Sequence, residues 1–132
     1  MIGTGYVGLV SGACFSDLGN KVYCVDKDLN KIKNLNMGIT PIYEPGLSEL
    51  IKRNFKAGRL IFTSDFSQAL KKSDIIFICV GTPTKKGSQS VDLKHVYNVV
   101  SQISKEKNTK KIIVTKSTVP VGTGDEIEKI LK

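Results

Sequence analysis

The chain has 132 residues, a formal charge of +8, and a composition that is 40% apolar and 24% charged, which is typical of one globular domain with its own core. No run approaches the ~18 apolar residues of a membrane span, so we expect no membrane partner. The basic residues form short scattered pairs without interleaved aromatic residues, which favours a solvated surface and argues against a nucleic-acid partner.

The chain opens with a glycine-rich turn, Gly3-Thr4-Gly5-Tyr6-Val7-Gly8. Glycines at this spacing are typical of a phosphate-binding turn: Gly3 permits a tight exit from a strand, Gly5 lets the backbone approach a pyrophosphate, and Gly8 lets the next helix pack closely. The amino end of that helix offers N–H groups and a positive dipole end to an anion. Only two residues precede the turn, so the first strand is expected to be shorter than the about five residues that are usual.

A helix is expected after the turn, ending at Gly19-Asn20. Its apolar residues recur at helical spacing, at Val10, Ala13, Cys14 and Leu18. A short apolar run then predicts a second strand, which ends on Asp26, 18 residues beyond Gly8. A carboxylate about 20 residues after the glycine turn is the group that binds an adenosine ribose in dinucleotide-binding folds. Together these features predict a dinucleotide site.

The rest of the chain alternates between helices and strands. Helices are expected at about 29–35, 45–58, 66–71, 92–103 and from 123 onward, and strands at 60–63, 75–80 and 111–116. Asp28, Asp65, Asp92 and Thr123 are the expected helix caps, and the continuous apolar run 75–80 predicts a strand buried on both faces. The fold class is therefore α/β, a Rossmann-type doubly wound parallel sheet in the order 3-2-1-4-5, with a shortened first strand and an end inside the helix after the fifth strand.

Three residues are candidates for the ligand site by position. Thr82 follows the fourth strand and Thr118 follows the fifth, and ligands of such sheets bind beyond the carboxyl ends of the strands. Thr82 could equally belong to a simple Gly-Thr-Pro turn. Lys31 stands in a first helical turn, where a cation opposes the helix dipole, beside the expected ribose acid. The single histidine, His95, is interpreted as a surface residue.

The three cysteines, Cys14, Cys24 and Cys79, stand in apolar stretches without metal-ligand spacing. Packed, reduced thiols are the expectation for all three, and no metal site is predicted. The odd number argues against a disulfide framework. A cytoplasmic location is the default expectation, because the chain also shows neither the basic nor the apolar region of a signal peptide.

Five motifs, taken in order, resemble the amino-terminal domain of the nucleotide-sugar dehydrogenases, the UDP-glucose/GDP-mannose dehydrogenase family. They are the glycine turn continued to Leu9, Val25-Asp26 with Lys31, Tyr43-Glu44-Pro45-Gly46-Leu47, Val80-Gly81-Thr82-Pro83 and Lys116-Ser117-Thr118-Val119-Pro120. The resemblance covers essentially the whole chain, residues 1–132, and is strongest to the UDP-glucose 6-dehydrogenases. These oxidise UDP-glucose to UDP-glucuronate with two NAD⁺.

The resemblance implies a role for each motif. Gly3, Gly5, Tyr6, Val7 and Gly8 would hold the pyrophosphate of NAD, Asp26 and Lys31 the adenosine ribose, and Thr82 the cofactor further along. Thr118 would contact the nicotinamide end and help order the catalytic water. A carboxylate at Asp26 favours NAD over NADP, a preference that Lys27 and Lys31 soften without reversing.

The family's catalytic cysteine and UDP-sugar half lie downstream of these motifs. The resemblance thus implies a partial, cofactor-binding domain that is inactive alone, from a parent enzyme that is a homodimer or larger and uses UDP-glucose. Two alternatives remain open at this point. One is a sister enzyme acting on UDP-N-acetylmannosamine or GDP-mannose, and the other is a non-catalytic dinucleotide-binding module.

Overall fold

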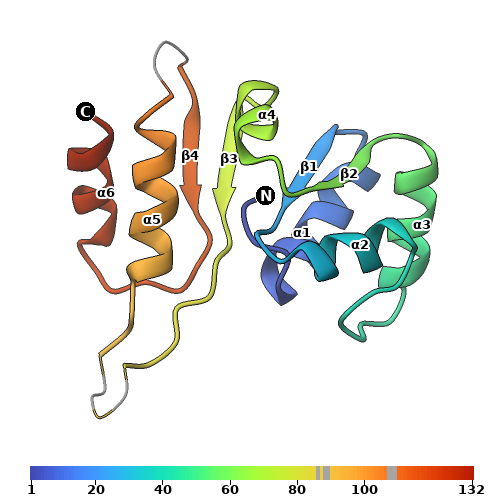
Figure 1. The fold of residues 1–132 in the computed structure, drawn as a ribbon, viewed down its shortest axis with the longest axis horizontal. Helices are drawn as coiled ribbons and strands as arrows, with labels where there is room; N and C mark the ends of the chain where they lie inside the picture. Colours follow the sequence, from blue (N-terminus) through green and yellow to red (C-terminus); the bar gives the residue numbers. More distant parts are fainter. Residues whose placement is uncertain (86, 88–89, 107–109) are drawn as a thin grey trace.

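A parallel sheet forms the middle layer of the computed structural model, which describes residues 1–85, 87, 90–106 and 110–132 (Figure 1). Its regular strands are β1 (Val22–Val25), β2 (Leu60–Thr63), β3 (Ile75–Ile78) and β4 (Ile112–Thr115). β1 pairs with β2, and β3 pairs with β4, both in parallel register. All four lie within two residues of the expected positions, because each is an apolar run bounded by polar or turn residues.

The first residues of the chain join these two pairs of strands. Ile2 forms parallel bridges to Val25 on one side and to Ile78 on the other. The backbone bonds are regular: the Ile2 amide donates to Phe77 O at 2.8 Å, and the Cys79 amide donates to Ile2 O at 2.8 Å. The strand order is thus β2, β1, the initial segment, β3, β4. This confirms the predicted 3-2-1-4-5 arrangement with a very short central strand.

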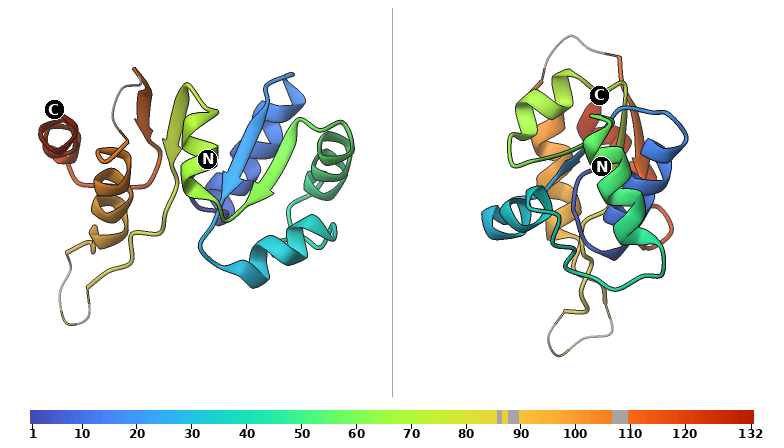
Figure 2. Two further views of the ribbon diagram at one scale, coloured as in Figure 1. Left: turned by 45° about the horizontal axis from the view of Figure 1, so that its top comes forward. Right: turned by 90° about the vertical axis from the view of Figure 1, so that its right-hand side faces the viewer.

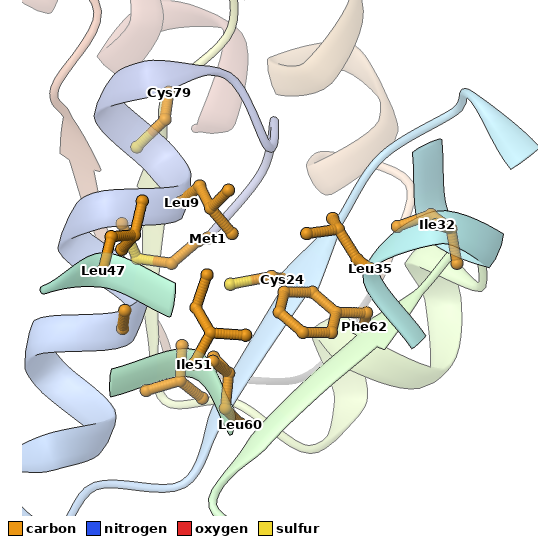
Figure 3. Close-up of a cluster of buried hydrophobic side chains, with 12 residues drawn as sticks. Met1, Leu9, Cys24, Ile32, Leu35, Leu47, Ile51, Leu60, Phe62 and Cys79 are labelled. Carbon is orange, nitrogen blue, oxygen red and sulfur yellow. The ribbon is translucent and has the colours of Figure 1, made fainter. Parts of the chain in front are cut away.

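Helices cover both faces of the sheet, and strand residues alternate between two cores. In β1, Cys24 faces one core while Tyr23 and Val25 face the other. The first core contains side chains of α1 (Tyr6–Asp17), α2 (Leu29–Asn36) and α3 (Leu47–Lys56), and Figure 3 shows it. The second contains side chains of α4 (Phe66–Lys71), α5 (Lys94–Ile103) and α6 (Thr123–Leu131). Figure 2 shows the same layers from two further directions.

The buried face of α1 differs from the predicted one. Its buried residues are Gly8, Leu9, Gly12, Ala13 and Ser16. Cys14 is exposed and Leu18 is 79% exposed, so the prediction was wrong for these two, whereas Ala13 is buried and Val10 packs against the first core as predicted. The reason is close packing, because a Cβ on Gly12 would lie 2.5 Å from Cys24 Sγ. Gly8, Gly12 and Ala13 therefore face the core together with Leu9.

Other local predictions had mixed outcomes. Asp28 and Asp65 cap α2 and α4 as expected, accepting from backbone amides at 2.9–3.1 Å. Asp92 lies one residue before Leu93, the N-cap of α5, and accepts from the Lys94 amide at 2.9 Å, so it is not the cap that was predicted. Thr123 does not cap α6: Gly122 occupies the N-cap at φ 89°, and the Thr123 hydroxyl donates instead to Pro120 O at 2.8 Å. Ile75 is 49% exposed, so the strand expected to be buried on both faces is open to solvent at its amino end.

A polar network fixes the carboxyl end of α1 against α3. The side chain of Asn54 is fully buried, donates to Asp17 Oδ1 at 3.0 Å and accepts from Arg59 at 2.7 Å. Arg59 also donates to Ser16 O at 3.1 Å, and Arg53 pairs with Asp17 at 2.7 Å. Orphan carbonyls and the negative dipole end of a helix favour such cationic partners. The network therefore holds in place the helix whose other end carries the glycine turn.

Candidate cofactor-binding site

The glycine turn lies at the carboxyl ends of the strands, and packing accounts for two of its glycines. Gly3 has φ 101°, and a Cβ there would lie 2.7 Å from Cys79 O. A Cβ on Gly8 would lie 1.9 Å from Gly3 O, so no larger residue could let α1 approach the turn. Both packing roles predicted from the motif are confirmed. Neither glycine can be replaced without moving backbone.

Gly5 is different, because the packing of the protein does not require a glycine there. Its φ is −74°, which any residue adopts, and a Cβ would meet no atom within 4 Å. Gly5 is the N-cap of α1 and makes no side-chain cap, and the first turn of α1 carries no acidic residue. The open space faces a helix amino end, which attracts anions through its N–H groups and dipole. This arrangement fits a close approach by a pyrophosphate.

The two residues that follow Gly5 are exposed at the start of the helix. Tyr6 is 54% and Val7 43% exposed. The Tyr6 hydroxyl donates to the Glu44 carboxylate, which belongs to the loop between α2 and α3. This contact joins the Tyr-Glu-Pro-Gly-Leu motif to the glycine turn, an association that the sequence order did not reveal.

Asp26, at the end of β1, is surrounded by hydrogen-bond donors. Its Oδ2 accepts from the Thr4 amide at 2.9 Å, from the Thr4 hydroxyl at 2.6 Å and from Lys31 Nζ at 3.3 Å. Its Oδ1 accepts from the Asp28 amide at 3.1 Å. The structure thus brings together the turn, Asp26 and Lys31, three features that the sequence placed in one site. Thr4 also belongs to this site, although sequence analysis did not predict it, because a threonine between two glycines is not part of any hydrophobic pattern.

These donors keep the Asp26 carboxylate ionised. Partial burial alone would raise its pKa, but the hydrogen bonds from the Thr4 hydroxyl and from the Asp28 and Thr4 amides outweigh it, with help from the Lys31 charge. The pKa of Asp26 therefore lies below its usual value. A stable negative charge at this position attracts neutral hydroxyl donors and repels a phosphate.

A cleft of about 600 Å³ opens between this group and α5, a volume typical of small-molecule sites. Its lining includes Gly3, Gly5, Asp26 and Lys31 on one side. On the other side, residues of α5 one helical turn apart line it: His95, Asn98, Val99 and Gln102. His95 is exposed, as predicted, yet it faces the cleft. The polar residues His95, Asn98 and Gln102 recur at helical spacing in the sequence, but the fold was needed to show that they line the cleft opposite Asp26.

Thr82 and Thr118 lie next to each other and outside the lining of this cleft. The Thr82 hydroxyl donates to Thr118 O at 2.9 Å, so its donor is engaged in joining the two loops. Ser117 adds a second link by donating to Val80 O at 2.7 Å. The side chain of Thr118 is exposed. The structure therefore brings the two predicted threonines together, and Gly81 and Pro83 on either side of Thr82 line the same cleft as Asp26 and Lys31.

Within residues 1–85, 87, 90–106 and 110–132, no helix combines the length and apolar character needed to cross a membrane. Within the same ranges, no group of His, Cys, Asp and Glu side chains is arranged to hold a metal ion.

Comparison with known proteins gives the family. Residues 1–132 match the model of the UDP-glucose/GDP-mannose dehydrogenase family, NAD binding domain. Among curated proteins, the UDP-glucose 6-dehydrogenase of Rhizobium meliloti is 52% identical over the whole chain, and the UDP-glucose 6-dehydrogenase TuaD of Bacillus subtilis is 51% identical. The chain spans 30% and 28% of the lengths of these relatives.

Solved structures show the same similarity. A GDP-mannose dehydrogenase ternary complex from Pseudomonas aeruginosa superimposes with a TM-score of 0.92 at 41% identity, covering 98% of this chain and 30% of that one. A UDP-glucose dehydrogenase from Pyrobaculum islandicum gives 0.88 at 33% identity, with 98% and 32% covered. The glycine turn, the acid that ends β1 and the doubly wound sheet thus occur in a chain that belongs to the UDP-glucose/GDP-mannose dehydrogenase family, as its NAD-binding domain.

Proposed function

We propose that this chain is the NAD-binding portion of a UDP-glucose 6-dehydrogenase. Such an enzyme oxidises UDP-glucose to UDP-glucuronate with two NAD⁺. The observation that carries the proposal is the agreement of the whole chain with relatives of that name, joined to a cleft that the glycine turn and an ionised Asp26 line side by side. The carboxyl-end position of this cleft is the usual ligand position in open α/β sheets.

The charge and exposure of the residues around Asp26 support their proposed roles in binding the adenosine end of the cofactor. Gly3, Gly5, Tyr6, Val7 and Gly8 would hold the pyrophosphate against the amino end of α1. The Asp26 carboxylate and Lys31 would hold the adenosine ribose. NAD has two hydroxyls on this ribose, whereas NADP carries a phosphate that the ionised carboxylate would repel. Lys31 Nζ lies 3.3 Å from Asp26 Oδ2 and neutralises part of its charge, so the binding of NADP would be weakened and not abolished.

The two threonines would serve the other end of the cofactor. NAD, when bound, supplies the hydride acceptor, and its nicotinamide would lie toward the loops after β3 and β4. Thr82 would position the Thr118 loop, because its hydroxyl donates to Thr118 O. The exposed Thr118 hydroxyl would remain free to orient water beside the nicotinamide, which is the catalytic role that the family resemblance implies.

The choice of nucleotide sugar rests on sequence similarity. Structural similarity does not distinguish the substrates, since a GDP-mannose dehydrogenase and a UDP-glucose dehydrogenase both superimpose closely. Sequence similarity favours UDP-glucose, because the relatives above half identity carry that name. A cytoplasmic location and an assembly of two or more subunits belong to the same proposal.

The test uses the protein expressed from its complete gene. It is incubated with NAD⁺ and, in separate reactions, UDP-glucose, UDP-N-acetylmannosamine or GDP-mannose, and NADH is followed by absorbance. We expect sustained NADH formation with UDP-glucose and UDP-glucuronate as the product by mass spectrometry. Residues 1–132 alone should bind NAD⁺ without turnover. Turnover with another of the three sugars alone would reassign the substrate, and NAD⁺ binding without any turnover would favour a non-catalytic module.

A further inference from the structure

Thr4 is a polar side chain enclosed within the glycine turn. It is fully buried, while its neighbour Gly5 is exposed. A buried hydroxyl needs a partner, and Thr4 has the Asp26 carboxylate at 2.6 Å. Its own backbone amide donates to the same oxygen at 2.9 Å. Thr4 thus links the segment expected to hold a pyrophosphate to the group expected to hold a ribose.

The two oxygens of Asp26 are unequally occupied. Oδ2 accepts three donors, from the Thr4 amide, the Thr4 hydroxyl and Lys31 Nζ. Oδ1 accepts one among the residues that the structure describes, from the Asp28 amide. A carboxylate has about four acceptor sites, two on each oxygen. Oδ2 is therefore saturated and Oδ1 has room for one more donor. The Asp26 side chain is 12% exposed, and the residue lines the cleft.

We infer that Thr4 is a positioning residue for the cofactor: by holding Oδ2, its hydroxyl fixes the Asp26 carboxylate so that Oδ1 is the acceptor for an adenosine-ribose hydroxyl. The inference rests on the cofactor role proposed above for Asp26. A short O–H···O⁻ bond is among the stronger hydrogen bonds, and the β-branched side chain of threonine restricts its own χ1. Lys31 is a weaker anchor, because it is 31% exposed and stands at 3.3 Å on a flexible stem.

The substitution Thr4→Val removes the hydroxyl with almost no change in shape, and Thr4→Ser retains it. Both are made in the protein expressed from its complete gene, and NAD⁺ binding is measured by calorimetry, with thermal unfolding as a check on folding. Thr4→Val should weaken NAD⁺ roughly three- to tenfold, the effect of one hydrogen bond. Thr4→Ser should restore affinity to near that of the unmodified protein.

A double-mutant cycle with Asp26→Ala separates positioning from simple support of the turn. If Thr4 acts through Asp26, Thr4→Val has no further effect on NAD⁺ affinity once the carboxylate is gone. If it only shapes the turn, it weakens binding equally in both backgrounds, and the inference is wrong.

Three results overturn the inference directly: unchanged affinity in Thr4→Val, failure of Thr4→Ser to rescue a weakened Thr4→Val, or no NAD⁺ binding by the unmodified protein. A different result would refute the proposed enzyme activity. Normal NAD⁺ binding with no oxidation of UDP-glucose would refute the activity and leave the Thr4 cycle fully interpretable.

Discussion

The ionised form of Asp26 is the form that its surroundings stabilise. Partial burial opposes the charge, and donors from Thr4, Asp28 and Lys31 more than offset that effect, so the folded-state pKa lies below the ordinary value of 3.8. A group with a depressed folded pKa contributes stability above its unfolded pKa, and that contribution is lost as the pH falls through the folded pKa. The same contacts that prepare Asp26 for a ribose therefore also stabilise the fold.

Replacing Asp26 by asparagine tests this linkage. Asp26→Asn should lower the free energy of unfolding near neutral pH by roughly 1–2 kcal/mol, because charge-assisted hydrogen bonds are lost. The difference from the unmodified protein should shrink as the pH falls below 3.8. Urea denaturation of both proteins across this range measures it. A difference that stays constant into acid would contradict the account.

Residue-level prediction from sequence succeeded where a motif fixes the geometry. Gly3 and Gly8 were predictable, because their spacing has one structural solution. Thr4 was not, since its role depends on a partner 22 positions away. Cys14 was predicted wrongly because hydrophobicity alone favoured one face of the helix, whereas the small volume of Gly12 decided which face meets Cys24.

At the scale of the element, α1 depends on both of its ends. Its amino end meets the cleft, and its carboxyl end is held by the network around Asn54, which joins Asp17 to Arg59. Local signals in the sequence predicted the helices and the caps Asp28 and Asp65. It could not predict this network, because its members come from α1, from α3 and from the loop before β2, which only the fold brings together.

Asn54→Ala should therefore destabilise the protein by roughly 1–3 kcal/mol, since Arg59 and Asp17 lose a buried partner. The matched control is Asn34→Ala in α2, where the asparagine is exposed and a surface change has an effect within about 0.5 kcal/mol. Urea denaturation provides both free energies. Equal values for the two variants would show that the network contributes nothing to stability.

At the scale of the molecule, the first residues of the chain join the two strand pairs of the described structure into one sheet. Ile2 bridges β1 on one side and β3 on the other and is 7% exposed. The strand order was predictable from the alternation of helices and strands. The sequence did not predict that one bridged residue, Ile2, could act as the central strand. Its pairing depends on Val25 and Ile78, which lie far from it in the sequence.

The substitution Ile2→Ala should cost about 2–5 kcal/mol, the usual range for a buried isoleucine, and it should act on both halves of the sheet at once. Ile39→Ala is the control, because Ile39 is 53% exposed. Hydrogen exchange should show faster opening of amides in both β1 and β3 in the Ile2 variant. Opening confined to one pair of strands would contradict a joining role.

The most direct test of the central claim is a calorimetric titration of the protein with NAD⁺ and, separately, NADP⁺, with Asp26→Ala compared to Asp74→Ala. Asp74 is an exposed carboxylate immediately before β3, at the opposite ends of the strands. We predict saturable NAD⁺ binding, weaker NADP⁺ binding, at least about tenfold loss of NAD⁺ affinity in Asp26→Ala, and no loss in Asp74→Ala. Equal NAD⁺ affinity in the two variants would contradict the assignment of the glycine turn and Asp26 as the cofactor site.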